Sequence, residues 1–179
     1  MTKTILAAPL TKAAFLGDQA ADYIRAHQDE PFALCVSYLE PHPPHTGPLN
    51  DLYDPASLPT GPTFMERPGD DTPLILRLMS AIYMESEEYG FDLRTSEGWR
   101  GVMARYWGNT TLVDRSVAKI LSTLQECGLA EDTIVVFTSD HGEQMGDHGI
   151  LGKTVMYEES VRVPLLLRAP MLEATPRHI

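Results

Sequence analysis

The chain has 179 residues, 43% of them hydrophobic, which is enough for one domain with a substantial core. Its 25 Asp and Glu residues outnumber its 14 Lys and Arg residues, and this argues against a nucleic-acid partner because a phosphate backbone binds a basic surface. No stretch of the sequence approaches the length of a membrane span.

The first elements are predicted to be a helix and a buried strand. The N-terminal apolar stretch is interrupted by Pro9 and Lys12, so we interpret it as folded structure and not as a signal peptide. That interpretation leaves the localisation unknown, and cytoplasmic by default. Thr11 fits the N-cap of a helix that runs to His27. The run FALCVSYL (32–39) is typical of a parallel strand covered on both faces.

The two cysteines, Cys35 and Cys127, lie in apolar surroundings of the sequence without a nearby basic residue. We therefore expect each to be a small buried side chain, and we expect no disulfide.

The middle of the chain combines an irregular segment with two helical stretches. Residues 41–73 are rich in Pro, Gly and Asp and are predicted to be a long excursion within one domain. Residues 73–90 are predicted to be helical. Residues 97–127 are predicted to form one long helix, or two helices joined near Gly108, that stops at Gly128. Its predicted buried face consists of Leu112, Val113, Val117, Ile120, Leu121 and Leu124.

Two further strands are predicted at residues 133–140 and within residues 161–170. Alternation of helices with apolar strands predicts an α/β domain with a mainly parallel or mixed sheet and helices on both faces. Functional groups in such domains collect beyond the carboxyl ends of the strands. Two predicted strands lead directly into segments that are rich in histidine and charged residues, EPHPPH (40–45) and SDHGEQMGDHGILGK (139–153). We therefore place a candidate active site where these two segments meet.

Asp140 and His141 are the candidate metal ligands. They follow a predicted strand directly, and a sharp turn at Gly142 could bring both side chains onto one cation. A carboxylate oxygen and an imidazole nitrogen suit Ca²⁺, Mn²⁺, Mg²⁺ or Zn²⁺. The structural alternative is an aspartate that caps a turn with a histidine stacked beside it.

The other polar residues of these segments also have two interpretations. Lys153 either binds an anionic substrate group or is a solvated surface charge, and His42 is either held for catalysis by the flanking prolines or is part of a rigid surface loop. His148 is a weaker candidate for the site. Glu143 and Asp147 are expected to serve turn geometry and solvation.

Four segments together resemble the sulfatase family of the alkaline phosphatase superfamily. They are EPHPPH (40–45), YWGNTTLVDRSVAKIL (106–121), TIVVFTSDHGEQMGDHGILGK (133–153) and YEESVRVPLLLRAP (157–170), and they run in family order. The resemblance covers most of the chain from about residue 11 onward and implies that residues 1–179 are a partial sulfatase catalytic domain with an alkaline phosphatase-like fold.

The resemblance implies a role for each candidate residue. Asp140 and His141 match two metal ligands, and many sulfatases carry Asn at the second position, whereas the His form occurs in related phosphonate monoester hydrolases. Lys153 matches the lysine that contacts sulfate and leaving-group oxygens. His42 matches the histidine that contacts the sulfate or protonates the departing alcohol. His148 lies in a common family segment and is assigned to substrate binding. The implied metal is Ca²⁺, with Mn²⁺ as the alternative.

The chain also departs from the family pattern. It contains no Cys-x-Pro-x-Arg or Ser-x-Pro-x-Arg motif, whose Cys or Ser becomes the formylglycine nucleophile in sulfatases. It also lacks the N-terminal aspartate pair and the C-terminal subdomain of the family. We therefore expect an internal fragment that is inactive by itself and that self-associates through sheet surface left uncovered.

The resemblance implies hydrolysis of a sulfate ester of a small molecule or saccharide to an alcohol and sulfate. One alternative is a phosphonate or phosphodiester hydrolase of the same superfamily, because sulfate and phosphate esters are near-isosteric anions. The other alternative is a non-catalytic sulfatase remnant.

Overall fold

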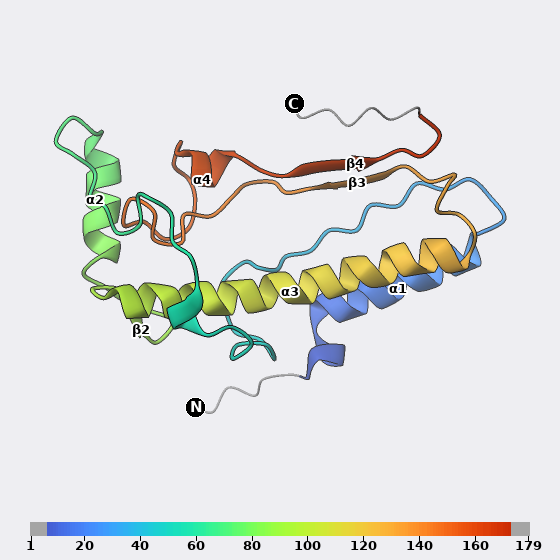
Figure 1. The fold of residues 1–179 in the computed structure, drawn as a ribbon, viewed down its shortest axis with the longest axis horizontal. Helices are drawn as coiled ribbons and strands as arrows, with labels where there is room; N and C mark the ends of the chain where they lie inside the picture. Colours follow the sequence, from blue (N-terminus) through green and yellow to red (C-terminus); the bar gives the residue numbers. More distant parts are fainter. Residues whose placement is uncertain (1–6, 173–179) are drawn as a thin grey trace.

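The computed structural model describes residues 7–172, and a pair of packed helices is its central feature (Figure 1). After a short helix η1 (Ala8–Leu10), helix α1 (Lys12–Ala26) begins as predicted, because the Thr11 side chain accepts a hydrogen bond from the Ala14 amide. Helix α1 lies along the C-terminal half of α3 (Ser96–Glu126). The Ser116 hydroxyl of α3 donates a hydrogen bond to the Ala13 carbonyl of α1 over 2.7 Å, which ties the two helices together.

Helix α3 is one helix of 31 residues, so the prediction of a single long helix is right and that of a joint at Gly108 is wrong. Gly108 serves packing, because a Cβ at this position would overlap the carbonyl oxygen of Leu49 in the irregular segment. The predicted buried face holds in part, since Leu112 and Leu124 are buried whereas Leu121 is 38% exposed.

The segment predicted to be helical over residues 73–90 is a helix followed by a hairpin. Helix α2 (Leu74–Tyr83) ends early, and strands β1 (Glu87–Glu88) and β2 (Phe91–Asp92) pair antiparallel. The two residues between the strands, Tyr89 and Gly90, have φ of 54° and 84°. Positive φ at both positions is typical of a tight hairpin turn whose twist matches that of the strands, which explains why the chain reverses here.

The predicted strands near residues 133–140 and 161–170 exist, but they pair in the opposite sense to the prediction. Strand β3 (Val135–Thr138) and strand β4 (Leu165–Arg168) are antiparallel, with Val135 opposite Arg168. The prediction of an α/β domain with a mainly parallel or mixed sheet and helices on both faces is therefore confirmed only in part: helices and strands are both present, but the two sheets within residues 7–172 are two-stranded and antiparallel. The apolar runs indicated strands, but they did not indicate which segment each strand pairs with.

The predicted strand over 32–39 is extended but is not assigned as a strand, because none of its backbone groups from residue 31 to 38 is paired within the described part of the chain. One side of it rests on the helices. The Tyr38 hydroxyl lies 2.9 Å from the Ser116 hydroxyl, and the Phe32 ring meets the edge of the Tyr23 ring at 5.9 Å. The other side is open, and Leu34 and Leu39 are exposed.

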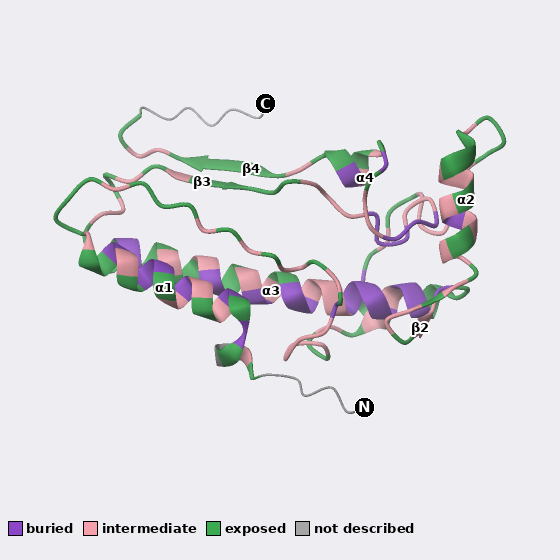
Figure 2. Cartoon of the chain, turned by 180° about the vertical axis from the view of Figure 1, so that it is seen from behind, coloured by how far each residue is buried: buried purple, intermediate pink, exposed green. Residues whose placement is uncertain are grey.

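The core lies at the N-terminal half of α3, where it meets the loop after β3 (Figure 2). Trp99 and Val102 of α3 are fully buried, as are Leu93 before it and Ile150 of the loop. Helix η2 (Pro55–Ser57) and helix α4 (Glu158–Val161) complete the elements around this core. The later part of the loop after β3 is therefore packed into this core, since Met145, Ile150 and Leu151 are buried.

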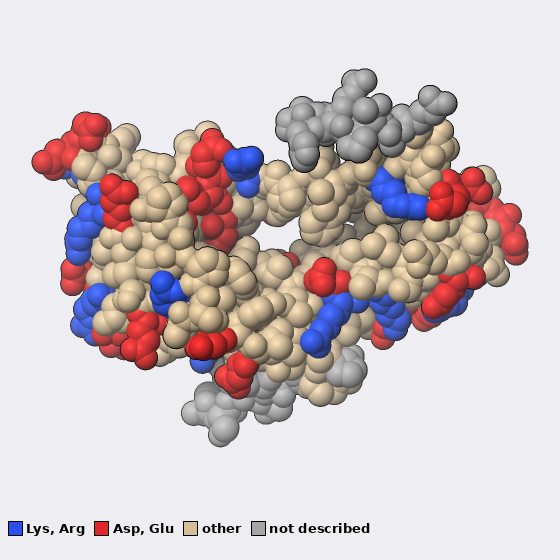
Figure 3. Space-filling view, in the orientation of Figure 1, with Lys and Arg blue, Asp and Glu red and all other residues tan. Residues whose placement is uncertain are grey.

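The surface carries acidic and basic side chains side by side (Figure 3), with ion pairs such as Arg168–Glu131 at 2.7 Å. Both cysteines are free, which agrees with the prediction of no disulfide. Cys35 is exposed and Cys127 half-buried, so the prediction that both are buried is wrong, because the extended segment around Cys35 is covered on one side only. No helix among residues 7–172 is long and apolar enough to cross a membrane.

Candidate active site

The loop that follows β3 is fixed at Gly142. The Gly142 amide donates a hydrogen bond to the Ser160 carbonyl over 2.7 Å, and a Cβ at residue 142 would overlap the carbonyl oxygen of Glu159. Only glycine permits this close backbone approach. The turn therefore holds Asp140 and His141 between the end of β3 and the segment before β4.

Asp140 and His141 present two metal-binding atoms to the same space. His141 Nδ1 lies 2.7 Å from the Gly142 carbonyl, and because a carbonyl only accepts, Nδ1 carries the proton and the Nε2 lone pair is free. Nε2 lies 3.6 Å from Asp140 Oδ2. A backbone carbonyl that fixes the tautomer in this way is a common support for a metal-binding histidine. The two atoms therefore fit one edge of a coordination shell.

Asp140 has the charge state that a cation needs. A hydrogen bond from its own backbone amide, helped by the neighbouring His141, lowers the pKa of Asp140 below its ordinary value. The two side chains are not a complete site, because no group of three or more His, Cys, Asp or Glu residues converges among the described residues. A hard cation such as Ca²⁺ takes about six to eight oxygens, so these donors supply only part of a shell.

Lys153 lines a cavity of about 290 Å³ beside this loop, as Glu143 does. Glu143 accepts a hydrogen bond from the Gly152 amide, which closes the loop and confirms its expected part in turn geometry. Burial raises the pKa of Glu143 above its ordinary value, although Lys153 acts in the opposite direction. The cavity is also lined by Pro43, His45, Met79, Tyr83, Glu88 and Tyr89.

His45 is a histidine of this cavity that the sequence did not single out. Its side chain is fully buried, with its ring against the edges of Tyr89 and Tyr106 at 5.1 and 5.6 Å. Burial lowers the pKa of His45 to about 4, and Lys153 contributes in the same direction. His45 is therefore neutral at pH 7 and close to the Lys153 charge.

The sequence points to a histidine in the segment PHPPH, but it does not indicate which of the two histidines lines the cavity. PHPPH (41–45) offers two histidines three positions apart, and the family resemblance selected the first. Which of the two is buried depends on packing against Tyr89 and Tyr106, which are 44 and more residues away along the chain.

His42 is exposed and lies beside the cavity, where its charge contributes to the lowered pKa of His45. His42 Nδ1 lies 2.9 Å from the Pro43 carbonyl, so Nδ1 carries a proton and Nε2 is the ring nitrogen left without a hydrogen bond among the described residues. No hydrogen bond or ion pair among residues 7–172 joins His42, Lys153 and the Asp140–His141 pair. His42 and Lys153 both lie close enough to His45 to lower its pKa, whereas the Asp140–His141 pair does not line their cavity.

His148 and Asp147 hold the loop in place. The His148 ring stacks on the Tyr157 ring at 3.8 Å, and its amide donates to the Thr63 carbonyl over 2.9 Å. Asp147 accepts a hydrogen bond from the Thr63 hydroxyl over 2.7 Å. Both contacts fasten the loop to the irregular segment, which fits the structural role expected of Asp147.

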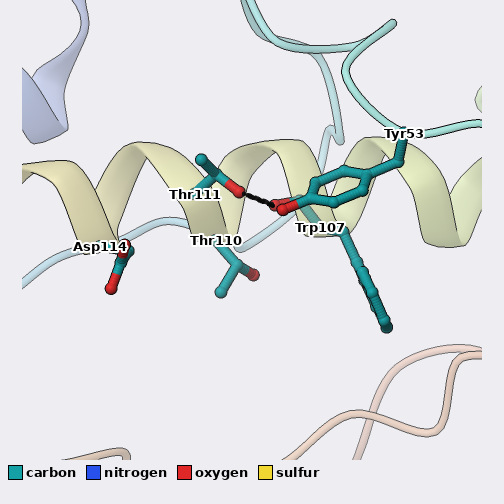
Figure 4. A pocket seen from close by; sticks show the side chains of 5 residues that line it. All are labelled: Tyr53, Trp107, Thr110, Thr111 and Asp114. Atoms are coloured by element: carbon teal, nitrogen blue, oxygen red, sulfur yellow. Dashed lines mark hydrogen bonds between the residues drawn. The ribbon is translucent and has the colours of Figure 1, made fainter.

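A second cavity of about 290 Å³ lies on the outer side of α3 (Figure 4). The Tyr53 hydroxyl lies 2.8 Å from the Thr111 hydroxyl there, and Tyr53 meets the edge of Trp107. Asp114 is the one carboxylate among its lining residues, which include no histidine or lysine, so this cavity lacks the chemistry of the first one.

Comparison with known proteins links this geometry to one family. The sulfatase family profile matches residues 9–178. The multifunctional alkaline phosphatase superfamily protein PehA of Trinickia caryophylli is 33% identical over 86% of this chain and 32% of its own length. The ulvan-active sulfatase of Formosa agariphila is 32% identical over 83% of this chain and 25% of its own length.

A solved structure gives the same result. The phosphonate monoester hydrolase of Agrobacterium radiobacter superposes on 93% of this chain and 34% of its own, with a TM-score of 0.77 and 33% identity. The fold of the chain is therefore that of one part of an alkaline phosphatase-like enzyme, in spite of its small antiparallel sheets. The chain spans about a third of the length of the relatives that it matches.

Proposed function

Because the chain belongs to the sulfatase family, we propose that the protein containing it hydrolyses a sulfate ester to an alcohol and sulfate. The observation that carries the proposal is the pair at the end of β3, where the His141 Nε2 lone pair and the Asp140 carboxylate lie 3.6 Å apart. Two such donors at a strand end suit a divalent cation, Ca²⁺ in our proposal and Mn²⁺ as the alternative. When bound, the cation would offset negative charge on the ester oxygens.

Lys153 is proposed to bind the anionic ester group. It has no ion-pair partner among the described residues and lines the cavity next to the loop, so its ammonium is available to the oxygens of a tetrahedral anion. Such a cation also stabilises the charge that develops on the leaving oxygen. We propose His148 as a further substrate contact, through the edge of its stacked ring.

His42 is proposed to protonate the departing alcohol. Its Nδ1 proton is held by the Pro43 carbonyl, so a proton on Nε2 of the imidazolium form is the one that can be donated. Positioned acid catalysis of this kind contributes roughly 10²–10⁴-fold to a rate. The nucleophile is assigned to none of the described residues, and we therefore keep the prediction that residues 1–179 alone turn over no sulfate ester.

The test uses the natural gene product that contains residues 1–179, with p-nitrophenyl sulfate as substrate. We expect Asp140→Asn to lower the bound divalent metal, measured by elemental analysis, and to lower kcat/KM by roughly 10–100-fold. Asp132→Asn is the matched control, because Asp132 is an exposed aspartate at the other end of the same strand segment. Unchanged metal content and activity in Asp140→Asn would overturn the proposed metal site.

A phosphonate or phosphodiester hydrolase is the second candidate, favoured by the close superposition on the Agrobacterium radiobacter enzyme. The residues of the cavity bind tetrahedral monoanions of sulfur and phosphorus alike. The ratio of kcat/KM for p-nitrophenyl sulfate and p-nitrophenyl phenylphosphonate decides between the two. A ratio above one supports the sulfatase, and a ratio well below one supports the phosphonate hydrolase.

A further inference from the structure

Helix α2 carries apolar side chains on its outer side. It stands at one end of the molecule, at a steep angle to α3 (Figure 1). Leu74, Ile75, Leu78 and Ile82 are between 48 and 66% exposed. A surface helix normally turns its apolar side chains toward the core and its polar side chains toward water. The reverse arrangement on α2 is typical of a surface that binds an apolar molecule.

The exposed side chains of α2 continue into the cavity beside Lys153. Two further residues of the helix, Met79 and Tyr83, line that cavity. Residues three or four positions apart are neighbours on a helix surface, so the exposed and the cavity-lining residues adjoin one another. Together they form one apolar stripe, the α2 stripe, which consists of Ile75, Leu78, Met79, Ile82 and Tyr83. The α2 stripe is about 12 Å long and leads from solvent into the cavity.

The opposite side of α2 is packed against the loop after β3. Ser80 is buried, and a Cβ at Gly149 of the loop would overlap the Ser80 hydroxyl and the Met84 sulfur. The one charged residue of the helix, Arg77, pairs with Asp70 at 3.2 Å and does not belong to the α2 stripe. The loop therefore holds α2 from one side, and the apolar stripe on the other side is free to bind a ligand.

The side of the cavity that α2 forms carries no charge. The charged lining residues are Glu88, Glu143 and Lys153, and they belong to β1 and to the loop after β3. A ligand whose anionic group is bound by Lys153 therefore meets only the α2 stripe where it contacts this helix. The continuity between the cavity and the stripe indicates that one molecule occupies both.

We infer that the α2 stripe binds the alcohol part of the ester and that this part is a long apolar chain. The inference rests on the proposed function for the anionic end of the substrate. With the ester group beside Lys153, the chain would lie along α2 and run toward Ile75. Contact between an apolar chain and exposed apolar side chains removes both from water, which favours binding.

A saccharide fits the α2 stripe less well than an alkyl chain does. Its hydroxyl groups would lie against Ile75, Leu78 and Ile82, whose side chains offer no hydrogen-bond partner. Polar groups that lose water without gaining a hydrogen bond weaken binding. The inference therefore narrows the proposed sulfate ester to one of an aliphatic, long-chain alcohol.

The experiment measures binding of ethyl, butyl, hexyl and octyl sulfate by titration calorimetry. It uses the natural gene product that contains this chain, at ester concentrations too low for micelles. Full burial of a methylene is worth about fourfold in affinity, and a chain on a helix surface is covered on one side, so we expect about twofold per methylene. Octyl sulfate should therefore bind roughly 60-fold more tightly than ethyl sulfate. Equal dissociation constants across the series would overturn the inference.

A double variant tests where the chain lies. In Leu78→Gln, Ile82→Gln, octyl sulfate should bind about tenfold more weakly, whereas ethyl sulfate is too short to contact these side chains and should bind as before. The matched control is Phe15→Gln, since Phe15 is 60% exposed on α1, away from α2 (Figure 1). No loss in the double variant, or an equal loss in the control, would contradict the assigned site.

A second copy of this chain is the other candidate occupant of the α2 stripe. Light scattering on the unmodified protein and on the double variant tests it. A dimer that becomes a monomer in the double variant, together with affinities that do not rise with chain length, would overturn the inference. If the double variant does not fold, as judged by circular dichroism, the single variant Ile82→Gln takes its place, and the series on the unmodified protein still decides the chain-length dependence.

The inference and the proposed function fail in different ways. Hydrolysis of sulfate esters, with equal affinities for all four chain lengths, would overturn the inference and leave the proposed function standing. Affinity that rises with chain length, without hydrolysis of these esters or of p-nitrophenyl sulfate, would support the inference and overturn the proposed function.

Discussion

The core around Trp99 of α3 and the strand pair β3–β4 are both built from apolar sequence, yet only the core is buried. Trp99 and Ile150 are fully buried, whereas Leu165, Leu166 and Leu167 of β4 are each more than 60% exposed. Figure 3 shows an opening between the strand pair β3–β4 and the helices α1 and α3. An apolar run therefore predicts where a strand forms, but it does not predict that the strand is buried. Burial requires other segments to pack against the strand, and no segment within residues 7–172 covers the β4 leucines.

The residues of the candidate site also differ in how far they are buried. Lys153 and His45 line one cavity, and His45 is fully buried while Lys153 is half-buried. Asp140 follows the exposed strand β3, and its side chain is 84% exposed. Packing therefore fixes His45 in the half of the site that contains Lys153, and the metal-binding half depends on the Gly142 turn.

The largest contrast should come from truncating one aromatic side chain in each region. Trp99→Ala should lower the free energy of unfolding by about 3–5 kcal/mol, because it removes a fully buried ring from the core. Phe137→Ala in β3, where the side chain is 39% exposed, should cost roughly 1 kcal/mol or less. Urea unfolding followed by circular dichroism measures both, and equal losses would show that the two regions are packed alike.

A smaller loss of stability is expected at Gly142, in the turn that joins β3 to the packed part of the loop. Gly142→Ala should lower the free energy of unfolding by about 1–3 kcal/mol, because the new Cβ overlaps the Glu159 carbonyl. Gly69→Ala is the control, since the nearest atom there is a flexible Asp71 side-chain oxygen. If both variants unfold at the same urea concentration as the unmodified chain, the turn does not fix Asp140 and His141.

The well-packed region should also show a pH dependence that His45 contributes. Its folded pKa of about 4 lies below the ordinary 6.5, so the unfolded chain binds more protons between these values. The stability contributed by neutral His45 is complete above pH 6.5 and is lost as the pH falls toward 4. His42, Lys153 and Glu143 surround it and are unchanged in the variant.

The measurement compares urea unfolding of the unmodified chain and of His45→Phe at pH 7 and pH 5. The unmodified chain should lose more stability over this interval than the variant does. A titration of the His45 ring by NMR with a midpoint near 6.5 would contradict the buried, neutral state.

The smallest effect on stability is expected at the exposed strand pair β3–β4. The double variant Leu165→Glu, Leu167→Glu should change the free energy of unfolding by only about 0.5 kcal/mol, because both side chains are already exposed. We expect the unmodified chain to self-associate through this surface and the variant to do so less, since exposed apolar strands pair with other chains. Light scattering measures both, and a monomeric unmodified chain would contradict this expectation.

Much of the local structure could be predicted from the sequence, and much of the tertiary pairing could not. Thr11 and the period of residues 96–126 identify α1 and α3, because caps and helical spacing are local signals. The end of α2 at Tyr83 was missed because the turn at Tyr89 and Gly90 was not recognised as a hairpin signal. The antiparallel sense of β3 and β4 depends on contacts about 30 residues apart, which apolar runs do not encode.

The candidate site likewise contains residues whose grouping could be predicted from the sequence and residues whose grouping could not. Asp140, His141 and Lys153 lie in one loop, so their grouping follows from the chain itself. His45, Glu88 and the two tyrosines reach the cavity from three separate elements, and only packing brings them together. No local pattern distinguishes the buried His45 from the exposed His42.

The central claim, that the loop from Asp140 to Lys153 forms the active site, is tested most directly at Lys153. The measurement is kcat/KM of Lys153→Ala on p-nitrophenyl sulfate, in the natural gene product that contains this chain. The matched control is Lys119→Ala, since Lys119 pairs with Asp18 on the helices. We predict a loss of at least about 100-fold in Lys153→Ala and no loss in the control, and equal activity in the two variants would contradict the account.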